Sequence, residues 1–236
     1  MKDTNKNIEI SNRLKLIASM VTEGHRLADV GTDLGYVPIY LVLNGAVDKA
    51  LAMDINKGPL EKASEHIGFY GLEDKITTRL SDGLKAYNKG EADTILIAGM
   101  GGALTVHILT DGLDKLGEST ELVLSPQSEI FLVREFLQKN NFMITDEKMI
   151  YDEGKYYTVI KAKRGVDENQ YSEIEMEYGY VALANKDDVL KSMLERDRAK
   201  YEAIIEQIKG QSNQAADRLN DLLKKVEGIK ELLNRY

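Results

Sequence analysis

The 236-residue sequence contains no cysteine and no tryptophan, and it has only three histidines. Without cysteine the chain can form no disulfide and can offer no thiolate to a metal ion. His25, His66 and His107 are scattered and lack the paired spacing of metal-binding histidines. We therefore expect no metal in this protein.

Long hydrophobic runs are also missing, since no stretch approaches the roughly 18 apolar residues that a membrane helix needs. The first 15 residues are too polar for a signal peptide. We therefore expect a cytoplasmic protein that crosses no membrane. Hydrophobic residues make up 43% and charged residues 30% of the chain, a mixture typical of globular proteins that excludes wholesale disorder.

Basic residues are outnumbered, with 31 Lys and Arg against 39 Asp and Glu, which gives a net charge of −8. The field of the whole protein would therefore repel a nucleic acid. An RNA partner would have to bind a local basic patch.

Proline and glycine are concentrated in the first two thirds of the chain. All three prolines and 16 of the 19 glycines precede Val166. Turns are therefore expected mainly before this point. We place a domain boundary in the polar segment that starts at Lys163, and predict one domain over residues 1–165 and a second over 166–236.

The first part alternates short runs rich in Val, Ile, Leu and Ala with segments of helical spacing. This alternation predicts an α/β domain whose parallel sheet is covered by helices on both faces. Two further runs, joined by four residues with no room for a helix, predict an antiparallel hairpin at or near the sheet edge. The predicted parallel strands are Arg26–Val30, Ala50–Ile55, Lys75–Leu80, Thr94–Ala98 and Glu121–Ser125, the helices are Pro38–Asn44, Pro59–Tyr70, Ala103–Asp111 and Ile130–Lys139, and the hairpin strands are Phe142–Ile150 and Tyr156–Ala162.

The second part carries apolar residues at heptad spacing. A break at Gly210–Asn213 divides two such series, which predicts an antiparallel coiled-coil hairpin of α-helices. Asp197 occupies a position in the first series, where we expect it to weaken the contact or mark a point at which the helices splay. The first series is Leu194, Tyr201, Ile204 and Ile208, and the second is Leu219, Leu222, Val226, Ile229 and Leu233.

The strongest local motif lies where the first predicted strand turns into a helix. Asp29, Gly31 and Gly35 form the pattern D-x-G-x-x-x-G. This differs from the G-x-G-x-x-G that places a pyrophosphate on a helix N-terminus. A carboxylate before the turn would repel a pyrophosphate, but it suits a ligand that carries an ammonium or sulfonium charge.

Three more loops at the carboxyl ends of predicted strands could contact the same ligand. Asp54 and Ile55 close the second strand, where an acidic residue can bind both hydroxyls of a ribose. Asp82 and Gly83 follow the third strand and could reach an adenine amino group. The segment 99–102, of sequence Gly-Met-Gly-Gly, follows the fourth. Because these loops share one edge of the sheet, they predict a nucleoside site.

The order of elements and these motifs resemble the class I S-adenosylmethionine-dependent methyltransferases, whose sheet ends in such a hairpin. More narrowly, the chain resembles the bacterial TrmK family, which methylates N1 of the adenine at position 22 of tRNA. The motifs that carry this resemblance are Ile10–Leu14, Ala28–Asp33, Ile97–Gly102 and Ser125–Gln127. The chain departs from the family at Leu34-Gly35 and at Ser125-Pro126-Gln127, where we expect His-Ala and Gln-Pro-Asn.

The resemblance implies a Rossmann-like fold, S-adenosylmethionine as cofactor and tRNA as substrate. It points to Asp33 and Tyr36 at the target base. The implied cofactor contacts are Asp29, Gly31, Asp54, Ile55, Asp82, Gly83, Gly99, Met100 and Gly101, and the implied substrate contacts are Arg13, Gly102, Ser125, Pro126 and Gln127.

Other interpretations of these residues stay open at this point. Asp33 could be an ordinary N-cap of the first helix of the sheet domain. The chain could be an NAD-dependent oxidoreductase, although the missing G-x-G-x-x-G counts against that, or a non-catalytic adaptor with a vestigial nucleoside site. A heptad hairpin suits a homodimer as well as an RNA contact, and we expect a monomer.

Overall fold

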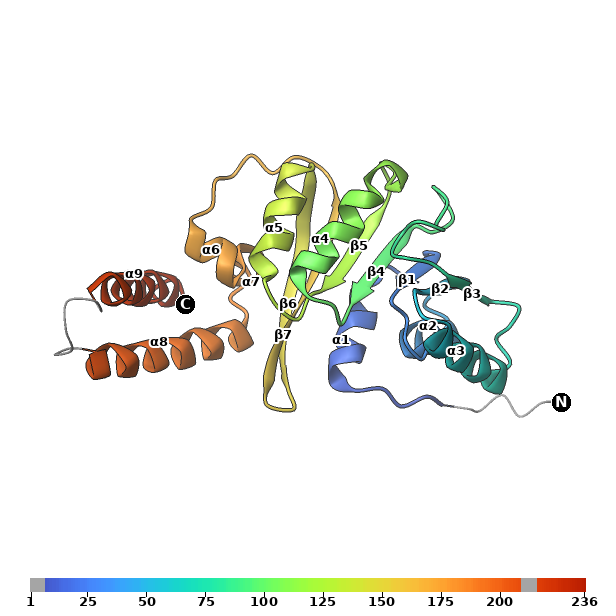
Figure 1. The fold of residues 1–236 in the computed structure, drawn as a ribbon, viewed down its shortest axis with the longest axis horizontal. Helices are drawn as coiled ribbons and strands as arrows, with labels where there is room; N and C mark the ends of the chain where they lie inside the picture. Colours follow the sequence, from blue (N-terminus) through green and yellow to red (C-terminus); the bar gives the residue numbers. More distant parts are fainter. Residues whose placement is uncertain (1–6, 209–215) are drawn as a thin grey trace.

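The computed structural model describes residues 7–208 and 216–236, and its centre is a sheet of seven strands in the order β3-β2-β1-β4-β5-β7-β6 (Figure 1). The first five strands are parallel, and β7 runs antiparallel to both β5 and β6. The α/β prediction with an antiparallel hairpin at the edge is confirmed. The strands are β1 (Leu27–Val30), β2 (Ala50–Asp54), β3 (Ile76–Leu80), β4 (Thr94–Ala98), β5 (Glu121–Ser125), β6 (Phe142–Asp152) and β7 (Lys155–Arg164).

Helices cover both faces of this sheet. Alternate residues of each strand point to opposite faces, so Ala28 and Val30 pack toward α4 and α5 while Leu27 packs toward α1, α2 and α3. Each face therefore has its own apolar core. The helices are α1 (Asn12–Met20), α2 (Tyr36–Leu43), α3 (Lys57–Tyr70), α4 (Gly102–Asp111) and α5 (Ile130–Lys139), with a 3₁₀ turn, η1 (Leu113–Lys115), before β5.

The β6–β7 hairpin is longer than predicted. Pairing continues to Asp152 and Lys155, so that only Glu153 and Gly154 form the turn. Both turn residues have positive φ angles, 47° and 82°, which is the geometry that lets a two-residue turn match the twist of its strands. The tip of this hairpin projects well beyond the end of β5 (Figure 1).

The C-terminal part holds more helices than the heptad pattern predicts. The paired helices α8 and α9 are antiparallel, because Tyr201 meets Lys225 while Lys191 meets Tyr236. Leu232 is buried in place of the predicted Leu233, which is half-buried. The predicted break at Gly210–Asn213 lies outside the described residues. The four elements are α6 (Glu173–Tyr178), α7 (Tyr180–Ala184), α8 (Asp188–Ile208) and α9 (Ala216–Leu233).

Asp197 on α8 is a buried polar residue that contacts α6. Its carboxylate accepts a hydrogen bond of 3.1 Å from the hydroxyl of Tyr178 and two from the guanidinium of Arg196. The heptad pattern does not show the donor that α6 supplies, and a weaker or splayed contact between α8 and α9 at Asp197 stays a prediction.

A buried ion pair joins the C-terminal helices to the sheet domain. Arg134 on α5 and Glu147 on β6 are 2.7 Å apart, and both side chains are at most 1% exposed. Arg134 also donates to the carbonyls of Met176 and Glu177, and Glu147 accepts from the backbone N–H of Ala182. Residues on both sides of the predicted 165/166 boundary thus share one polar network.

Gly179 lets α6 and α7 turn against this ion pair. Its φ of 113° is open to glycine alone, and a side chain there would meet Glu147 at 2.6 Å and Arg134 at 2.9 Å. Met149 on β6 then packs into the apolar core that Tyr178 and Leu194 help to form. The C-terminal helices are therefore packed on β6 instead of being linked to it only through the chain.

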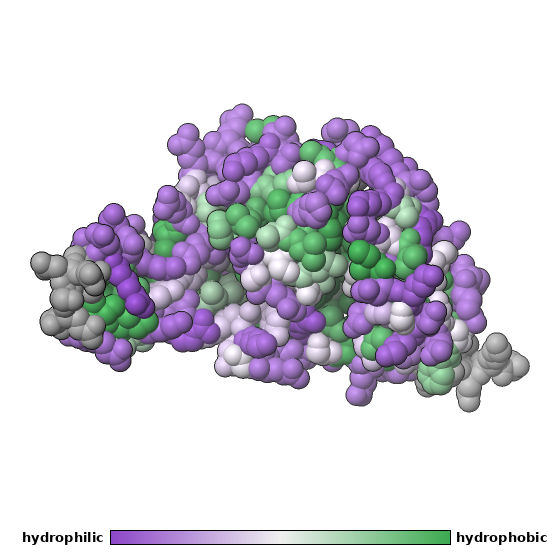
Figure 2. All heavy atoms as spheres, in the orientation of Figure 1, coloured by the Kyte–Doolittle hydropathy of each residue, from purple (hydrophilic) through white to green (hydrophobic). Residues whose placement is uncertain are grey.

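Hydrophilic atoms cover most of the face shown in Figure 2, with apolar atoms grouped over α4 and α5 and at the α8–α9 pair. Leu104 on α4 is 48% exposed and Phe131 on α5 is 41% exposed. None of the helices within residues 7–208 and 216–236 is both long and apolar enough to span a lipid bilayer.

We expect Arg134→Met to lower the free energy of unfolding by about 3–5 kcal/mol, because it leaves the Glu147 carboxylate buried without a partner. The double variant Arg134→Met/Glu147→Met removes both charges and should recover part of that loss. Urea denaturation measures both. Lys139→Met, which removes an exposed ion pair with Glu135 on the same helix, is the control and should cost less than about 1 kcal/mol. If Arg134→Met also costs less than about 1 kcal/mol, the Arg134–Glu147 pair does not hold the C-terminal helices to the sheet domain.

Candidate active site

The loop after β1 is held against β2 by main-chain hydrogen bonds. The N–H groups of Gly31 and Thr32 both donate to the carbonyl of Met53, at 2.8 and 2.9 Å. The Thr32 hydroxyl donates to the Asp29 carboxylate at 2.7 Å. Since β1 and β2 are neighbouring parallel strands in the centre of the sheet, this loop has a rigid support.

Asp54, the last residue of β2, fixes the next part of the same loop. One carboxylate oxygen accepts from the N–H of Asn56 at 2.8 Å, and the other accepts from the N–H of Asp33 at 3.3 Å. A carboxylate has about four acceptor positions. Two therefore remain for a ligand, although Asp54 itself is only 7% exposed.

Asp29 lies beneath the loop and is 5% exposed. The pKa of the Asp29 carboxyl is raised to about 7, chiefly by burial and also by the nearby charge of Asp54, while the hydrogen bond from Thr32 acts in the opposite direction. A ligand that brings positive charge to this place would stabilise the ionised form of Asp29.

Asp33 is exposed at the mouth of the loop and has a φ of 52°. The helix that follows, α2, has Gly35 as its N-cap and no side chain that caps it. The N-cap interpretation of Asp33 is therefore wrong. Its carboxylate is free of helix contacts, while its N–H is bound to Asp54.

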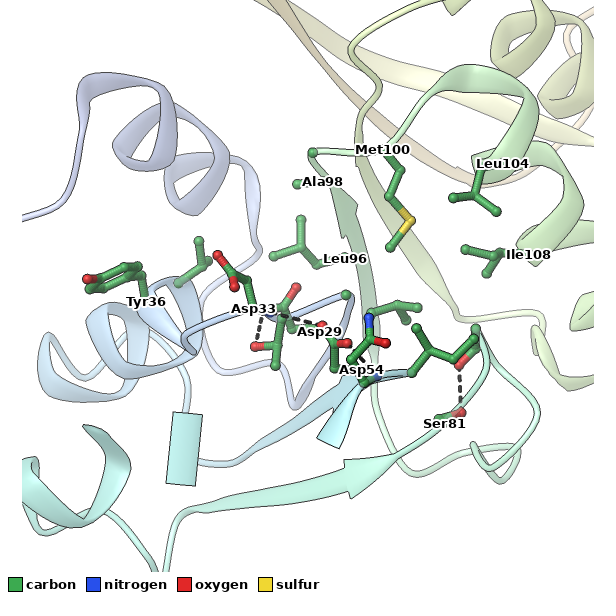
Figure 3. A pocket seen from close by; sticks show the side chains of 18 of the residues that line it. Asp29, Asp33, Tyr36, Asp54, Ser81, Leu96, Ala98, Met100, Leu104 and Ile108 are labelled. Carbon is green, nitrogen blue, oxygen red and sulfur yellow. Dashed lines mark hydrogen bonds between the residues drawn. The ribbon is translucent and has the colours of Figure 1, made fainter. Parts of the chain in front are cut away.

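Tyr36 begins α2 and lies beyond Asp33 on the side away from Asp54 (Figure 3). Tyr36 is 37% exposed, and the centre of its ring lies 5.7 Å from that of His66 on α3. The Nδ1 atom of His66 is 3.1 Å from the carbonyl of Leu34. His66 was not among the predicted site residues, because its proximity to Tyr36 depends on how α3 packs against the loop.

The loops after β4 and β5 pair with each other along their backbones. Gly99 donates to the carbonyl of Ser125, Gln127 donates to that of Met100, and Gly102 donates to that of Ser128. A side chain at Gly102 would overlap the carbonyl of Glu129, so this close approach requires glycine. The two loops therefore form one unit on the carboxyl edge of the sheet.

The loop after β3 is folded by Ser81, whose hydroxyl donates to the carbonyl of Gly83 and accepts from the N–H of Ala86. Asp82 points outward and pairs with Lys85 at 2.5 Å. Both side chains are more than half exposed. A ligand can thus replace Lys85 as the partner of Asp82, because an exposed ion pair is weak.

These loops enclose a cavity of about 540 Å³. Asp33, Asp29 and Asp54 follow one another across it, while Met100, Leu104 and Ile108 line the opposite wall (Figure 3). The methyl end of Met100 lies over Gly31, in the space that a side chain there would need. One acidic wall and one apolar wall suit a flat organic group attached to a cation.

Most of the predicted site residues meet at this cavity. Those that line it are Arg13, Asp29, Gly31, Asp33, Tyr36, Asp54, Ile55, Asp82, Gly83, Gly99, Met100 and Gln127. Gly101, Gly102, Ser125 and Pro126 do not line it. The hydroxyl of Ser125 donates to the carbonyl of Thr158 at 3.1 Å inside the sheet, and Pro126 is buried. The geometry therefore gives Ser125 and Pro126 a structural position rather than contact with a substrate.

The cavity is also lined by residues that were not predicted from the sequence, which are Leu14, Val30, Thr32, Val37, Asn56, Ser81, Leu96, Ala98, Leu104 and Ile108. Thr32 and Asn56 lie next to predicted residues in loops that follow strands. That position could have identified them as lining residues. Leu104 and Ile108 show no signal, because helical spacing alone does not tell which side of α4 faces a cavity.

The ionisation of Asp29 predicts a pH dependence of stability. Because its pKa is higher in the folded protein than the ordinary value of 3.8, the folded state binds more protons in the window between about pH 4 and 7, and stability falls as pH rises through it. Asp29→Asn removes this effect while keeping an acceptor for Thr32.

Thermal and urea unfolding of the ligand-free protein at pH 5 and pH 8 test this prediction. The wild type should lose about 2–3 kcal/mol more than Asp29→Asn between these two pH values. Equal losses would mean that Asp29 keeps its ordinary pKa in the folded protein despite its burial.

Residues 10–160 match a family described as a methyltransferase domain. The chain is 35% identical over 237 residues to the tRNA (adenine(22)-N(1))-methyltransferase of Bacillus subtilis, covering 96% of this chain and 98% of that one. The crystal structure of that enzyme, B. subtilis TrmK, aligns with a TM-score of 0.85 at 33% identity, over 96% of this chain and all of the other.

Two further structures contain ligands. A putative tRNA (m1A22) methyltransferase from Streptococcus pneumoniae, in complex with S-adenosyl-L-methionine, is 32% identical with a TM-score of 0.84, over 95% of this chain and 100% of that one. M. capricolum TrmK in complex with S-adenosyl-homocysteine is 27% identical with a TM-score of 0.81, over 96% and 98%. With relatives of this identity and coverage, the chain belongs to the TrmK family of tRNA (adenine(22)-N(1))-methyltransferases.

Proposed function

We propose that this protein transfers the methyl group of S-adenosylmethionine to N1 of the adenine at position 22 of tRNA. The observation that carries the proposal is the cavity at the carboxyl ends of β1 to β4, which joins three carboxylates of the predicted motifs to an apolar wall in a chain of the TrmK family. An NAD-dependent oxidoreductase fits this cavity poorly, because the turn after β1 lacks the G-x-G-x-x-G that binds a pyrophosphate and has the carboxyl groups of Asp29 and Asp33 beside it.

The residues present fit S-adenosylmethionine along the length of the cavity. The two open acceptor positions of Asp54 match the two hydroxyls of a ribose. Ile55, which is 59% exposed, offers an apolar surface for the adenine ring, and Asp82 with Gly83 bounds its far side. The turn at Gly31 and the loop at Gly99 and Met100 border the other end.

S-adenosylmethionine supplies a methyl group on a sulfonium when it is bound. The protein's part is to hold the target adenine so that N1 approaches that methyl in line. N1 carries its own lone pair, so no strong base is needed. The adenine gains positive charge as the new bond forms. In this proposal the exposed carboxylate of Asp33 accepts a hydrogen bond from the adenine amino group and stabilises that charge.

Because N1 lies on the Watson–Crick edge, the target base must be unpaired or rotated out of its helix to enter the site. Tyr36 at the mouth of the cavity and Gln127 on the paired loops would contact such a base.

The tip of the β6–β7 hairpin lies between the sheet domain and α8, with Tyr157 against Arg13 and Tyr156 against Arg196. We infer that this tip and the C-terminal helices of residues 166–236 contact the tRNA, and that the protein works as a monomer.

Labelled S-adenosylmethionine and unmodified tRNA transcripts test the function directly. A transcript with adenine at position 22 should acquire one methyl group at N1 of that base, mapped by mass spectrometry of nuclease fragments. A matched transcript with guanine at position 22 should acquire none. Methylation at another position, or cofactor binding with no methylation of any tRNA, would contradict the proposal, and the second result would favour an adaptor.

Asp33→Asn should lower kcat roughly 100-fold or more, because the variant keeps the shape but loses the charge that faces the product-like base. Asparagine tolerates a positive φ, and Asp33 caps no helix, so the melting temperature should hardly change. Asp48→Asn, at an exposed position before β2 on the opposite edge of the sheet, is the control and should keep full activity. A stable Asp33→Asn protein with the wild-type rate would remove Asp33 from the chemistry.

A further inference from the structure

The tip of the β6–β7 hairpin projects from the edge of the sheet at which the cavity opens. β6 runs parallel to β5, since both pair antiparallel with β7, so β6 ends at the carboxyl edge. β7 pairs with β5 only from Ile160 onward, and its earlier residues extend beyond the end of β5 (Figure 1). An RNA that lies across this edge therefore meets the tip beside the cavity.

The two faces of the tip have different neighbours. Tyr156 and Tyr157 are consecutive in β7, so their side chains point to opposite faces. The ring centre of Tyr157 lies 5.1 Å from the guanidinium of Arg13, which lines the cavity, whereas that of Tyr156 lies 4.3 Å from the guanidinium of Arg196 on α8. Tyr151 pairs with Tyr156 across the two strands. It therefore shares the face toward α8, and it does not line the cavity.

Tyr151 is a large aromatic residue that the fold leaves 56% exposed. Tyr156 supports it from one side, with the ring centres 4.7 Å apart at an interplanar angle of 54°. The Tyr156 hydroxyl is 3.3 Å from that of Ser192 on α8, and Asp152 accepts a hydrogen bond of 3.3 Å from the N–H of Arg13 on α1. Because the tip is held from both faces, a ligand that stacks on Tyr151 does not have to order it first.

The charges of the tip favour contact with a base over contact with a phosphate. Asp152 and Glu153 outnumber Lys155 in the tip, and the nearby Arg196 is already paired with Asp197 at 2.7 Å. A phosphate would gain little from such surroundings. The face of a nucleobase carries no net charge, and every base can stack on an aromatic ring.

We propose that Tyr151 stacks on an unpaired base of the tRNA other than the target adenine. The inference rests on the proposed function and makes Tyr151 a positioning residue, because it lies outside the cavity in which the methyl group is transferred. Stacking at the tip holds the tRNA across the carboxyl edge while the target adenine enters the cavity. Tyr151 therefore contributes to tRNA binding and not to the chemical step.

Methylation kinetics with the adenine-22 transcript test this role. Tyr151→Ala should raise the KM for tRNA roughly 5- to 150-fold. It should leave kcat within about twofold, because the stacking is the same before and during methyl transfer. Tyr151→Phe keeps the ring and should stay within about threefold of the wild-type KM.

Fluorescence anisotropy of labelled tRNA provides a second readout that needs no methyl transfer. Tyrosine is uncharged, so its loss releases no phosphate contact. The slope of log Kd against log salt concentration should therefore be the same for Tyr151→Ala and the wild type, although the affinity of the variant is lower at every salt concentration.

Phe69→Ala is the matched control. Phe69 is 61% exposed and contacts the ring of Tyr70 edge-on, with the ring centres 5.1 Å apart. α3 carries it from the end of β2 back to the amino edge of the sheet, away from the cavity. This variant should keep the wild-type KM. Calorimetric titration with S-adenosylhomocysteine should give the wild-type affinity for Tyr151→Ala, because Tyr151 does not line the cavity.

A wild-type KM for Tyr151→Ala would overturn the inference. A Tyr151→Phe variant as weak as Tyr151→Ala would overturn it too, because the hydroxyl and not the ring would then be the contact. Lost affinity for S-adenosylhomocysteine in Tyr151→Ala would make Tyr151 a structural residue, and a smaller salt slope would assign the effect to phosphates. A wild type that binds tRNA without methylating adenine 22 would contradict the proposed function itself, which separates the two failures.

Discussion

The site depends on one carbonyl group, that of Met53, which accepts hydrogen bonds from the successive N–H groups of Gly31 and Thr32. Two donors on one acceptor force the chain to turn sharply as it leaves β1. The turn places the N–H of Asp33 on the Asp54 carboxylate and leaves the side chain of Asp33 exposed at a positive φ. A backbone constraint in the centre of a parallel sheet thus sets the positions of both carboxylates.

At the carboxyl edge of the sheet, a few residues both hold the loops in place and face the cavity. Asp54 uses one acceptor position of each oxygen to hold the protein and keeps the others for a ligand. Asp29 lies beneath the loop, and its burial there raises its pKa. Gly102 and Ser125, by contrast, serve the fold, since they hold the loops after β4 and β5 together and to β7. They support the wall of the cavity that carries Met100 and Gln127.

The strands, helices α2 to α5 and the positions of the ligand loops could be predicted from the sequence, because hydrophobic periodicity and glycine position are local signals. Helix α1 was not among the predicted elements. What could not be predicted depends on contacts between distant segments. α6 and α7 are short, and their position follows from the Arg134–Glu147 pair, whose partners are 13 residues apart and bind backbone groups further along the chain. The burial of Asp197 likewise requires Tyr178. The shift from Leu233 to Leu232 follows from packing at the end of α9 against α8 and α6.

We propose the cavity at the carboxyl edge of the sheet as the cofactor site. A crystal structure of the protein with S-adenosylhomocysteine would show where the cofactor product binds. We predict the ribose hydroxyls within about 3 Å of the Asp54 carboxylate, the adenine against Ile55 and the sulfur between Gly31 and Met100, facing Asp33. A ligand bound elsewhere, or one in this cavity with its ribose away from Asp54, would contradict the account.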